Sequence, residues 1–293
     1  MKLQHLFKEG ILQCRALSPG YEGHASDVWL VRTPKQEVVV RASRMMGEPS
    51  SPFWWGCQQL FGIDPRRVHQ LENINNALQE LKEIPVPRVL QKGFIGQREC
   101  VIVEKVEGDV LQQFEDQPAS VLESLGEGLA CIHKQEHTYV GSPTGDFQVK
   151  LEHFHTHCID VMEAMISRFY SKDQDIATSL PNMVVQLKEL PAPTSTAYVM
   201  VDMDSTQFLS DQVSITGLVD TEAYVIAPRA FDFIGLEYIL DAPAAEAFKV
   251  GYTRVLPLPY LKECRMPYRY LYRLLEVQGR VPVKEWLDQK VLF

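Results

Sequence analysis

The most constraining feature of this sequence is a strand, a loop and a hairpin that together carry three polar residues. An apolar strand delivers Asp202 at its carboxyl end, a four-residue loop follows, and Gln207 opens a short strand. The turn around Asp211 reverses the chain, so the returning strand brings Asp220 back toward Asp202 and Gln207. Carboxylate and amide oxygens are hard ligands of the kind that hold Mg²⁺ together with a polyphosphate. The segment therefore predicts a site for phosphate transfer.

The composition excludes several other classes of protein. Of the 293 residues, 45% are hydrophobic and 23% are charged, which is typical of a folded chain with a sizeable core. The net charge of −9 disfavours binding to phosphate backbones. No apolar run is long enough for a membrane span, and the first residues lack the apolar segment of a signal peptide. We therefore expect a cytoplasmic protein with no nucleic-acid partner and no membrane partner. The sequence does not indicate its oligomeric state.

Neither the cysteines nor the histidines indicate a second site. The six cysteines are spread along the chain without a C-x-x-C pair, so we expect reduced thiols. His153 and His157 would share one face of a helix, a spacing that can bind metal. No third ligand is evident, and we expect both histidines to be solvated.

Hydrophobic periodicity divides the chain into two parts near Gly108. The first part contains mostly strands, and its expected elements are a hairpin of residues 28–31 and 37–42, a helix between Pro65 and Pro85, and extended segments at 86–90, 92–95 and 99–106. The second part contains mostly helices, expected at 120–134, 151–170, about 173–190 with an interruption at Pro181, and 244–293, with short strands between 198 and 218. We therefore predict an N-terminal nucleotide-binding lobe of residues 1–106 and a C-terminal catalytic and substrate-binding lobe of residues 107–293.

The order of these motifs resembles that of the aminoglycoside phosphotransferase and choline kinase superfamily of small-molecule kinases, which share the plan of protein kinases. The family's loop reads H-G-D-x-x-x-x-N and is followed by I-D-W-E and then by D-P-x-x-D. The matching segments here are residues 200–207, 219–222 and 227–232, the last one residue longer than in the family. Weaker matches to the family's P-V-P segment, hinge and L-A-x-L-H helix are residues 84–90, 103–108 and 129–133.

The resemblance implies an α+β, two-lobed, protein-kinase-like fold, with a small strand-rich N-terminal lobe and a larger, mainly helical C-terminal lobe. It also implies that ATP or GTP binds with Mg²⁺ in the cleft between the lobes. Asp202 would be the catalytic base, and Gln207 and Asp220 would be the metal ligands. The acceptor would be a small hydroxylated substrate, such as an amino sugar or an amino alcohol.

The family's pattern also assigns nucleotide contacts in the N-terminal lobe. Arg41 would contact the phosphates, and a glutamate on the following helix would pair with it, for which Glu72 is the candidate. The backbone of Glu104 and Val106 would face the adenine. The turn that covers the triphosphate would contain Gly20, Gly23 and Ser26.

Two departures from the family's pattern leave a second function open. The loop His and Gly are Met200 and Val201, and the metal-binding Asn is Gln207, whose side chain is about one methylene longer. A positioning error of about 1 Å can cost roughly 10²-fold in rate. The alternative is therefore a pseudokinase that binds nucleotide or ligand without turnover.

The local spacing of Asp202, Asp204 and Thr206, taken alone, indicates a third possible function. Asp202, Asp204 and Thr206 after an apolar strand also match the nucleophile motif of haloacid-dehalogenase-like phosphatases, in which Asp202 would become phosphorylated. That fold carries the motif on its first core strand, and it gives no function to the strand-rich segment before Gly108.

Overall fold

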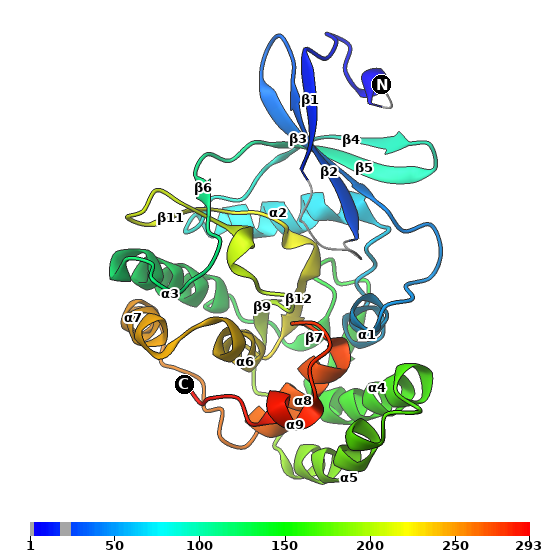
Figure 1. Cartoon of the computed structure of the whole chain (residues 1–293), viewed down its shortest axis with the longest axis vertical. Coiled ribbons are helices and arrows are strands. Elements are labelled where there is room, and N and C mark those ends of the chain that lie inside the picture. Colours follow the sequence, from blue (N-terminus) through cyan, green and yellow to red (C-terminus); the bar gives the residue numbers. More distant parts are fainter. Residues whose placement is uncertain (1–2, 18–24) are drawn as a thin grey trace.

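The computed structural model describes residues 3–17 and 25–293, and it has a strand-rich end and a helical end (Figure 1). At the strand-rich end, after a short helix η1 (Gln4–Leu6), five antiparallel strands form a sheet in the order β1-β2-β3-β5-β4. Their bounds are Gln13–Leu17 (β1), Ser26–Arg32 (β2), Glu37–Ser43 (β3), Val89–Ile95 (β4) and Arg98–Glu104 (β5). The expected hairpin is confirmed, because β2 pairs with β3.

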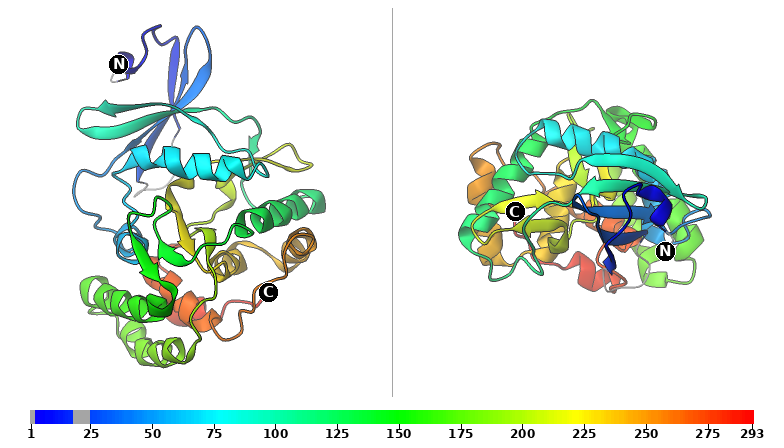
Figure 2. Two further views of the ribbon diagram at one scale, coloured as in Figure 1. Left: turned by 180° about the vertical axis from the view of Figure 1, so that it is seen from behind. Right: turned by 90° about the horizontal axis from the view of Figure 1, so that it is seen from above.

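The alternation of side chains along β3 decides what each face of this sheet carries. Val38 and Val40 pack into an apolar cluster on one face. Val39 lies on the other face, where it packs against the helices η2 (Val68–Gln70) and α2 (Leu71–Glu80). Arg41 shares that second face because side chains two residues apart point the same way. Figure 1 and the left view of Figure 2 place α2 between this sheet and the helical end of the molecule.

The helix expected before Pro85 is confirmed as η2 and α2, but the helix that precedes them was not expected. This helix is α1 (Pro52–Phe61), which begins with Ser51 accepting a hydrogen bond from the Trp54 amide and ends at Gly62 in the left-handed conformation. It packs against α4 and α8 in the helical end. A Cβ at Gly56 would lie 2.4 Å from a Leu275 methyl, so this glycine permits the close contact. The division of the chain at residue 106 stays a prediction.

Helices form the other end of the molecule, mostly where periodicity predicts them. Their bounds are Ala119–His133 (α3), Phe154–Phe169 (α4, preceded by η3, Leu151–His153), Gln174–Glu189 (α5), Ala230–Ile239 (α6), Ala242–Thr253 (α7), Arg265–Leu275 (α8) and Val283–Leu287 (α9). The interruption expected at Pro181 is wrong, because α5 continues through it. In the part of the chain that the structure describes, no helix has the length and apolarity needed to cross a membrane.

Short strands lie between the two ends and carry the candidate site. One sheet has the order β8-β7-β12-β9 and the other β11-β10-β6. Their bounds are Asp109–Val110 (β6), Tyr139–Gly141 (β7), Gln148–Lys150 (β8), Ala197–Met200 (β9), Phe208–Ser210 (β10), Ile215–Leu218 (β11) and Tyr224–Ala227 (β12), with the short helices Ser205–Gln207 (η4) and Thr221–Ala223 (η5) between strands. The predicted hairpin around Asp211 is confirmed as β10 and β11.

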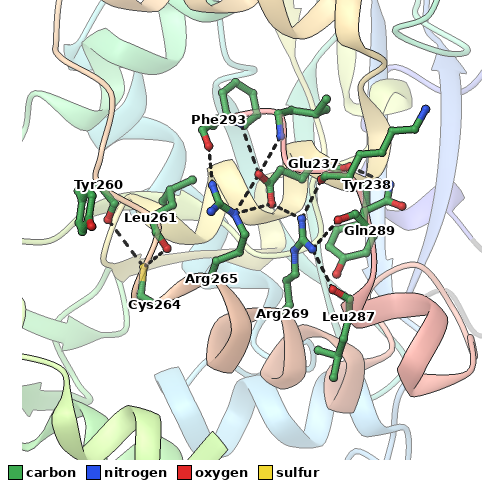
Figure 3. A network of polar contacts seen from close by, with 12 residues as sticks. Glu237, Tyr238, Tyr260, Leu261, Cys264, Arg265, Arg269, Leu287, Gln289 and Phe293 are labelled. Atoms are coloured by element: carbon green, nitrogen blue, oxygen red, sulfur yellow. Dashed lines mark hydrogen bonds and ion pairs between the residues drawn. The ribbon is translucent and has the colours of Figure 1, made fainter.

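A buried ionic network fixes the C-terminal segment against the helices (Figure 3). Glu237 of α6 is fully buried and bonds to Arg269 at 2.7 Å and to Arg265 at 3.2 Å. Arg269 also donates to backbone carbonyls of the segment 287–290, and the amide of Leu292 donates to Glu237. Each of these buried charges therefore has a partner, and together the contacts connect the C-terminal segment to α6 and α8.

Candidate active site

Asp202 lies just past the end of β9, at the predicted place. The residue as a whole is partly exposed, but its Oδ1 atom is buried and has no hydrogen-bond partner. Burial raises the pKa of Asp202 to about 8, and the nearby charge of Asp220 contributes to that shift. In the ligand-free protein this raised pKa favours the protonated form of the carboxyl. A carboxyl with a pKa near 8 can exchange a proton with a bound hydroxyl.

The loop after Asp202 is held by the side chain of Gln207. Its Oε1 accepts a hydrogen bond from the Asp204 amide at 2.9 Å, and its Nε2 donates to the Asp202 carbonyl at 3.1 Å. Asp204 in turn accepts hydrogen bonds from the amide and the hydroxyl of Thr206. This is a capping box, whose spacing (Asp, two residues, Gln) is visible in the sequence, although the sequence analysis assigned Gln207 only to metal. That metal assignment stays a prediction.

Asp220 has a backbone conformation that is rare for a residue with a side chain. Its φ of 61° and ψ of 53° lie in the left-handed region, which costs free energy and is common at functional sites. The side chain is 48% exposed and accepts a hydrogen bond from Arg41 Nη2 at 2.5 Å. The structure thus brings together two predicted site residues that are 179 positions apart in the chain.

Arg41 has a different second partner from the one expected. In addition to Asp220, Arg41 pairs with the carboxylate of Glu222, at 3.0 Å. Glu72 instead forms an ion pair with Lys92. The expectation for Glu72 is therefore wrong. Burial alone would lower the pKa of Arg41, but the charges of Asp220 and Glu222 outweigh it and raise the pKa, so the guanidinium stays charged.

The other predicted nucleotide-binding residues have different environments. Ser26 opens β2 and donates to both carboxylate oxygens of Glu222, at 2.8 and 2.9 Å. Glu104 ends β5, where its amide donates to the Arg88 carbonyl and its side chain pairs with the Arg88 guanidinium. Val106 lies in the link from β5 to β6. Gly20 and Gly23 lie outside the residues that the structure describes.

A buried polar chain fixes the strand that leads into Asp202. Asp232 of α6 accepts a hydrogen bond from the Met200 amide at 2.9 Å, and its other oxygen lies 2.9 Å from His133 Nε2. His133 Nδ1 lies 2.9 Å from the hydroxyl of Tyr252. Asp232 and His133 lie in segments that resemble family motifs, residues 227–232 and 129–133, but no function was predicted for either residue.

Several hard oxygen ligands are present, but most are already occupied. Within the described residues, no group of three His, Cys, Asp or Glu side chains is arranged to hold a metal ion. Gln207 Oε1 binds the Asp204 amide, and Glu222 binds Arg41 and Ser26. Asp220 also has a partner, because its Oδ1 binds Arg41, but its carboxylate is half-exposed and so is open to a further ligand.

The cysteines and the two helical histidines add no further site. All six cysteines are free thiols. His153 is exposed, as expected. His157 is only partly exposed, and its Nε2 lies 3.0 Å from the carbonyl of Gln59.

Comparison with known proteins gives matches only in structure. No protein-family model and no curated protein matches this sequence. The macrolide 2'-phosphotransferase MphH from Brachybacterium faecium is similar with a TM-score of 0.61 at 12% identity, over 91% of this chain and 84% of that one. A thermostable mutant of aminoglycoside phosphotransferase APH(4)-Ia, in complex with AMP-PNP and hygromycin B, gives 0.62 at 15% identity, over 93% and 87%.

A third solved structure is similar to the same extent. Spectinomycin phosphotransferase APH(9)-Ia, in complex with ADP and spectinomycin, gives a TM-score of 0.62 at 11% identity, over 94% of this chain and 85% of that one. At these identities the likeness establishes the fold. The chain therefore has the expected two-lobed, protein-kinase-like α+β fold, and the resemblance to these small-molecule phosphotransferases is confirmed at that level.

Proposed function

We propose that this chain transfers the γ-phosphate of ATP or GTP to a hydroxyl of a small molecule. The observation that carries the proposal is the ion pair between Arg41 and Asp220, which joins a strand cation to a half-exposed carboxylate beside Asp202. The fold supports it, because it is shared with phosphotransferases that were crystallised with AMP-PNP or ADP.

Each residue of the proposed site has a distinct task. Arg41 contacts the nucleotide phosphates, and Asp220 holds Mg²⁺, with Gln207 as the second proposed ligand. When bound, Mg²⁺ supplies positive charge that compensates the transferring phosphate. The charge of Asp220 is one cause of the raised pKa of Asp202, so a cation held at Asp220 would lower that pKa. Asp202 can then accept a hydrogen bond from the acceptor hydroxyl and orient it toward the γ-phosphate.

The remaining nucleotide contacts are proposed from the positions of three residues in the N-terminal strands and the link that follows them. The backbone of Glu104, at the end of β5, and of Val106, in the link after it, would face the adenine. Ser26, at the start of β2, would contact the phosphates. Neither ATP nor GTP is favoured by these contacts.

A small hydroxylated acceptor fits this arrangement. The carboxylates of Asp220 and Glu222 outnumber the one cation that they share, Arg41, so the site has a net negative charge, which suits an acceptor that also carries an amino group. Amino sugars and amino alcohols combine both groups. A cytoplasmic location stays a prediction.

A pseudokinase is the second candidate, for a specific reason. The amide oxygen of Gln207 is bonded within its own loop, and Arg41 is neutralised by two carboxylates. Such a site could bind nucleotide without turnover. The phosphatase alternative requires a different fold from the one observed, and we do not propose it.

A screen for nucleotide binding and for the acceptor tests the proposal. We expect Mg·ATP or Mg·GTP to raise the melting temperature, because a ligand at 100 times its Kd stabilises a fold by about 2.7 kcal/mol. ATP consumption is then followed over amino sugars, amino alcohols and other hydroxylated metabolites. A phosphorylated acceptor identifies a kinase, and binding with no turnover over the whole panel favours the pseudokinase. Absence of any shift at millimolar nucleotide with Mg²⁺ contradicts both.

A further inference from the structure

Two carboxylates from one turn hold Arg41. Its Nη2 lies 2.5 Å from Asp220 and 3.0 Å from Glu222, and its Nε donates to Glu222 at 3.2 Å. The side chains of Arg41 and Glu222 are 8% and 10% exposed, against 48% for Asp220. The inner, buried partner of the arginine is therefore Glu222, and Asp220 is the outer partner that faces solvent.

Glu222 is itself fixed from a second strand. The hydroxyl of Ser26, the first residue of β2, lies 2.8 and 2.9 Å from its two carboxylate oxygens. The carboxylate thus bridges Ser26 on β2 and Arg41 on β3, and it connects both strands to the turn that contains Asp220. A buried charged group with partners on two sides has few alternative positions.

Helix α2 contacts the same turn through an uncharged side chain. Asn75, which is buried, accepts a hydrogen bond from the hydroxyl of Thr221 at 2.5 Å and donates to the Pro87 carbonyl at 2.8 Å. The acidic residue in the first turn of α2, Glu72, binds Lys92 of β4 instead. The helix is therefore attached to the turn by a neutral hydrogen bond.

In protein kinases, the strand cation that contacts the phosphates is paired with a glutamate on the helix. We infer that Glu222 replaces this helix glutamate here, as the positioning residue that sets the guanidinium of Arg41 for the nucleotide phosphates. The inference rests on the proposed function, because it assigns Arg41 to nucleotide. It implies that no carboxylate on α2 controls the site.

A double-mutant cycle on nucleotide affinity tests this assignment. The Kd of Mg·ATP is measured by calorimetry for the wild type, Arg41→Ala, Glu222→Gln and the double variant. Glutamine keeps the shape of Glu222 but removes the charge that orients Arg41. We expect Glu222→Gln to weaken binding about tenfold, equivalent to about 1.4 kcal/mol. If Glu222 acts through Arg41, the double variant binds no more weakly than Arg41→Ala alone.

Glu72→Gln is the matched control, because it neutralises the helix carboxylate in the same way, and we expect its Kd to stay within twofold of the wild-type value. Ser26→Ala is a second, milder route to the same effect if Glu222→Gln does not fold, and its smaller loss should also vanish when Arg41 is alanine. Additive losses, an unchanged Kd in Glu222→Gln, or a loss in Glu72→Gln overturns the inference alone. A wild-type protein that binds no Mg·ATP overturns the proposed function and the inference together.

Discussion

Replacing Asp202 with asparagine should reduce the rate of phosphate transfer by about 10²- to 10⁴-fold, which is the range that a positioned proton acceptor contributes. Asparagine keeps the size of the side chain but cannot accept the proton of the acceptor hydroxyl. Nucleotide affinity should stay nearly unchanged, because Asp202 acts on the acceptor and not on the phosphates. Turnover is measured with whichever acceptor the screen identifies, and the Kd of Mg·ATP is measured by calorimetry.

Asp160→Asn provides the matched control for this substitution. Asp160 is an exposed residue of α4, so the same chemical change there should alter neither turnover nor affinity. If Asp202→Asn kept wild-type turnover, the assignment of Asp202 as the base would be wrong. A large loss of nucleotide affinity without loss of turnover would instead place Asp202 in the nucleotide site.

The stability of the ligand-free protein should fall as the pH rises through the pKa of Asp202. The folded-state pKa is about 8, above the ordinary value of 3.8, so the folded protein binds a proton that the unfolded chain has released. The contribution of Asp202 to the free energy of unfolding is therefore complete below about pH 4 and is lost as the pH approaches and passes 8. Since one pKa unit corresponds to about 1.4 kcal/mol, the total change is a few kcal/mol.

The comparison of the wild type with Asp202→Asn isolates this effect from all other titrating groups. Urea unfolding is measured between pH 5 and pH 9 with a chelator present, so that no divalent cation is bound. We expect the asparagine variant to gain stability relative to the wild type as the pH rises. Parallel stability curves for the two proteins would show that Asp202 is not held in its protonated form.

The sequence predicted the elements whose determinants are local. The β2–β3 hairpin, α2 and α3 follow from hydrophobic periodicity with nearby turns or prolines. Helix α1 was missed although its buried residues Trp54, Cys57 and Leu60 recur every three positions, because its aromatic residues are common in strands and its glycine disfavours a helix interior. Ser51, Pro52 and Gly62 are, however, start and stop signals that can be read from the sequence.

Pro181 shows how the surroundings of a residue override a local rule. Proline removes one backbone hydrogen bond of a helix, which normally ends or kinks it. Pro181 and Ala177, whose carbonyl loses its partner, are both exposed, so water can satisfy that carbonyl. Exposure depends on the packing of α5, which the local sequence does not reveal.

The sequence allows the grouping of Asp202, Asp220 and Arg41 to be predicted, but not the pairing of Arg41. Asp202, Asp220 and Arg41 are found near one another because the motif order fixes their strands. The partner of Arg41 depends on the tertiary structure, since Glu222 is 181 positions away, while Glu72 is turned toward Lys92 on β4. The spacing of residues within α2 therefore could not show that Arg41 pairs with Glu222 and not with Glu72.

Calorimetric titration of ATP into the wild type and Asp220→Ala, each with and without Mg²⁺, tests the central claim most directly. The claim is that nucleotide and metal bind together, with Arg41 contacting the phosphates and Asp220 holding the metal. We expect Mg²⁺ to strengthen ATP binding to the wild type and to have little effect on Asp220→Ala, because that variant lacks the charged ligand. Glu246→Ala, which removes an exposed carboxylate of α7, should behave as the wild type. Equal Mg²⁺ dependence in the wild type and Asp220→Ala would contradict the account.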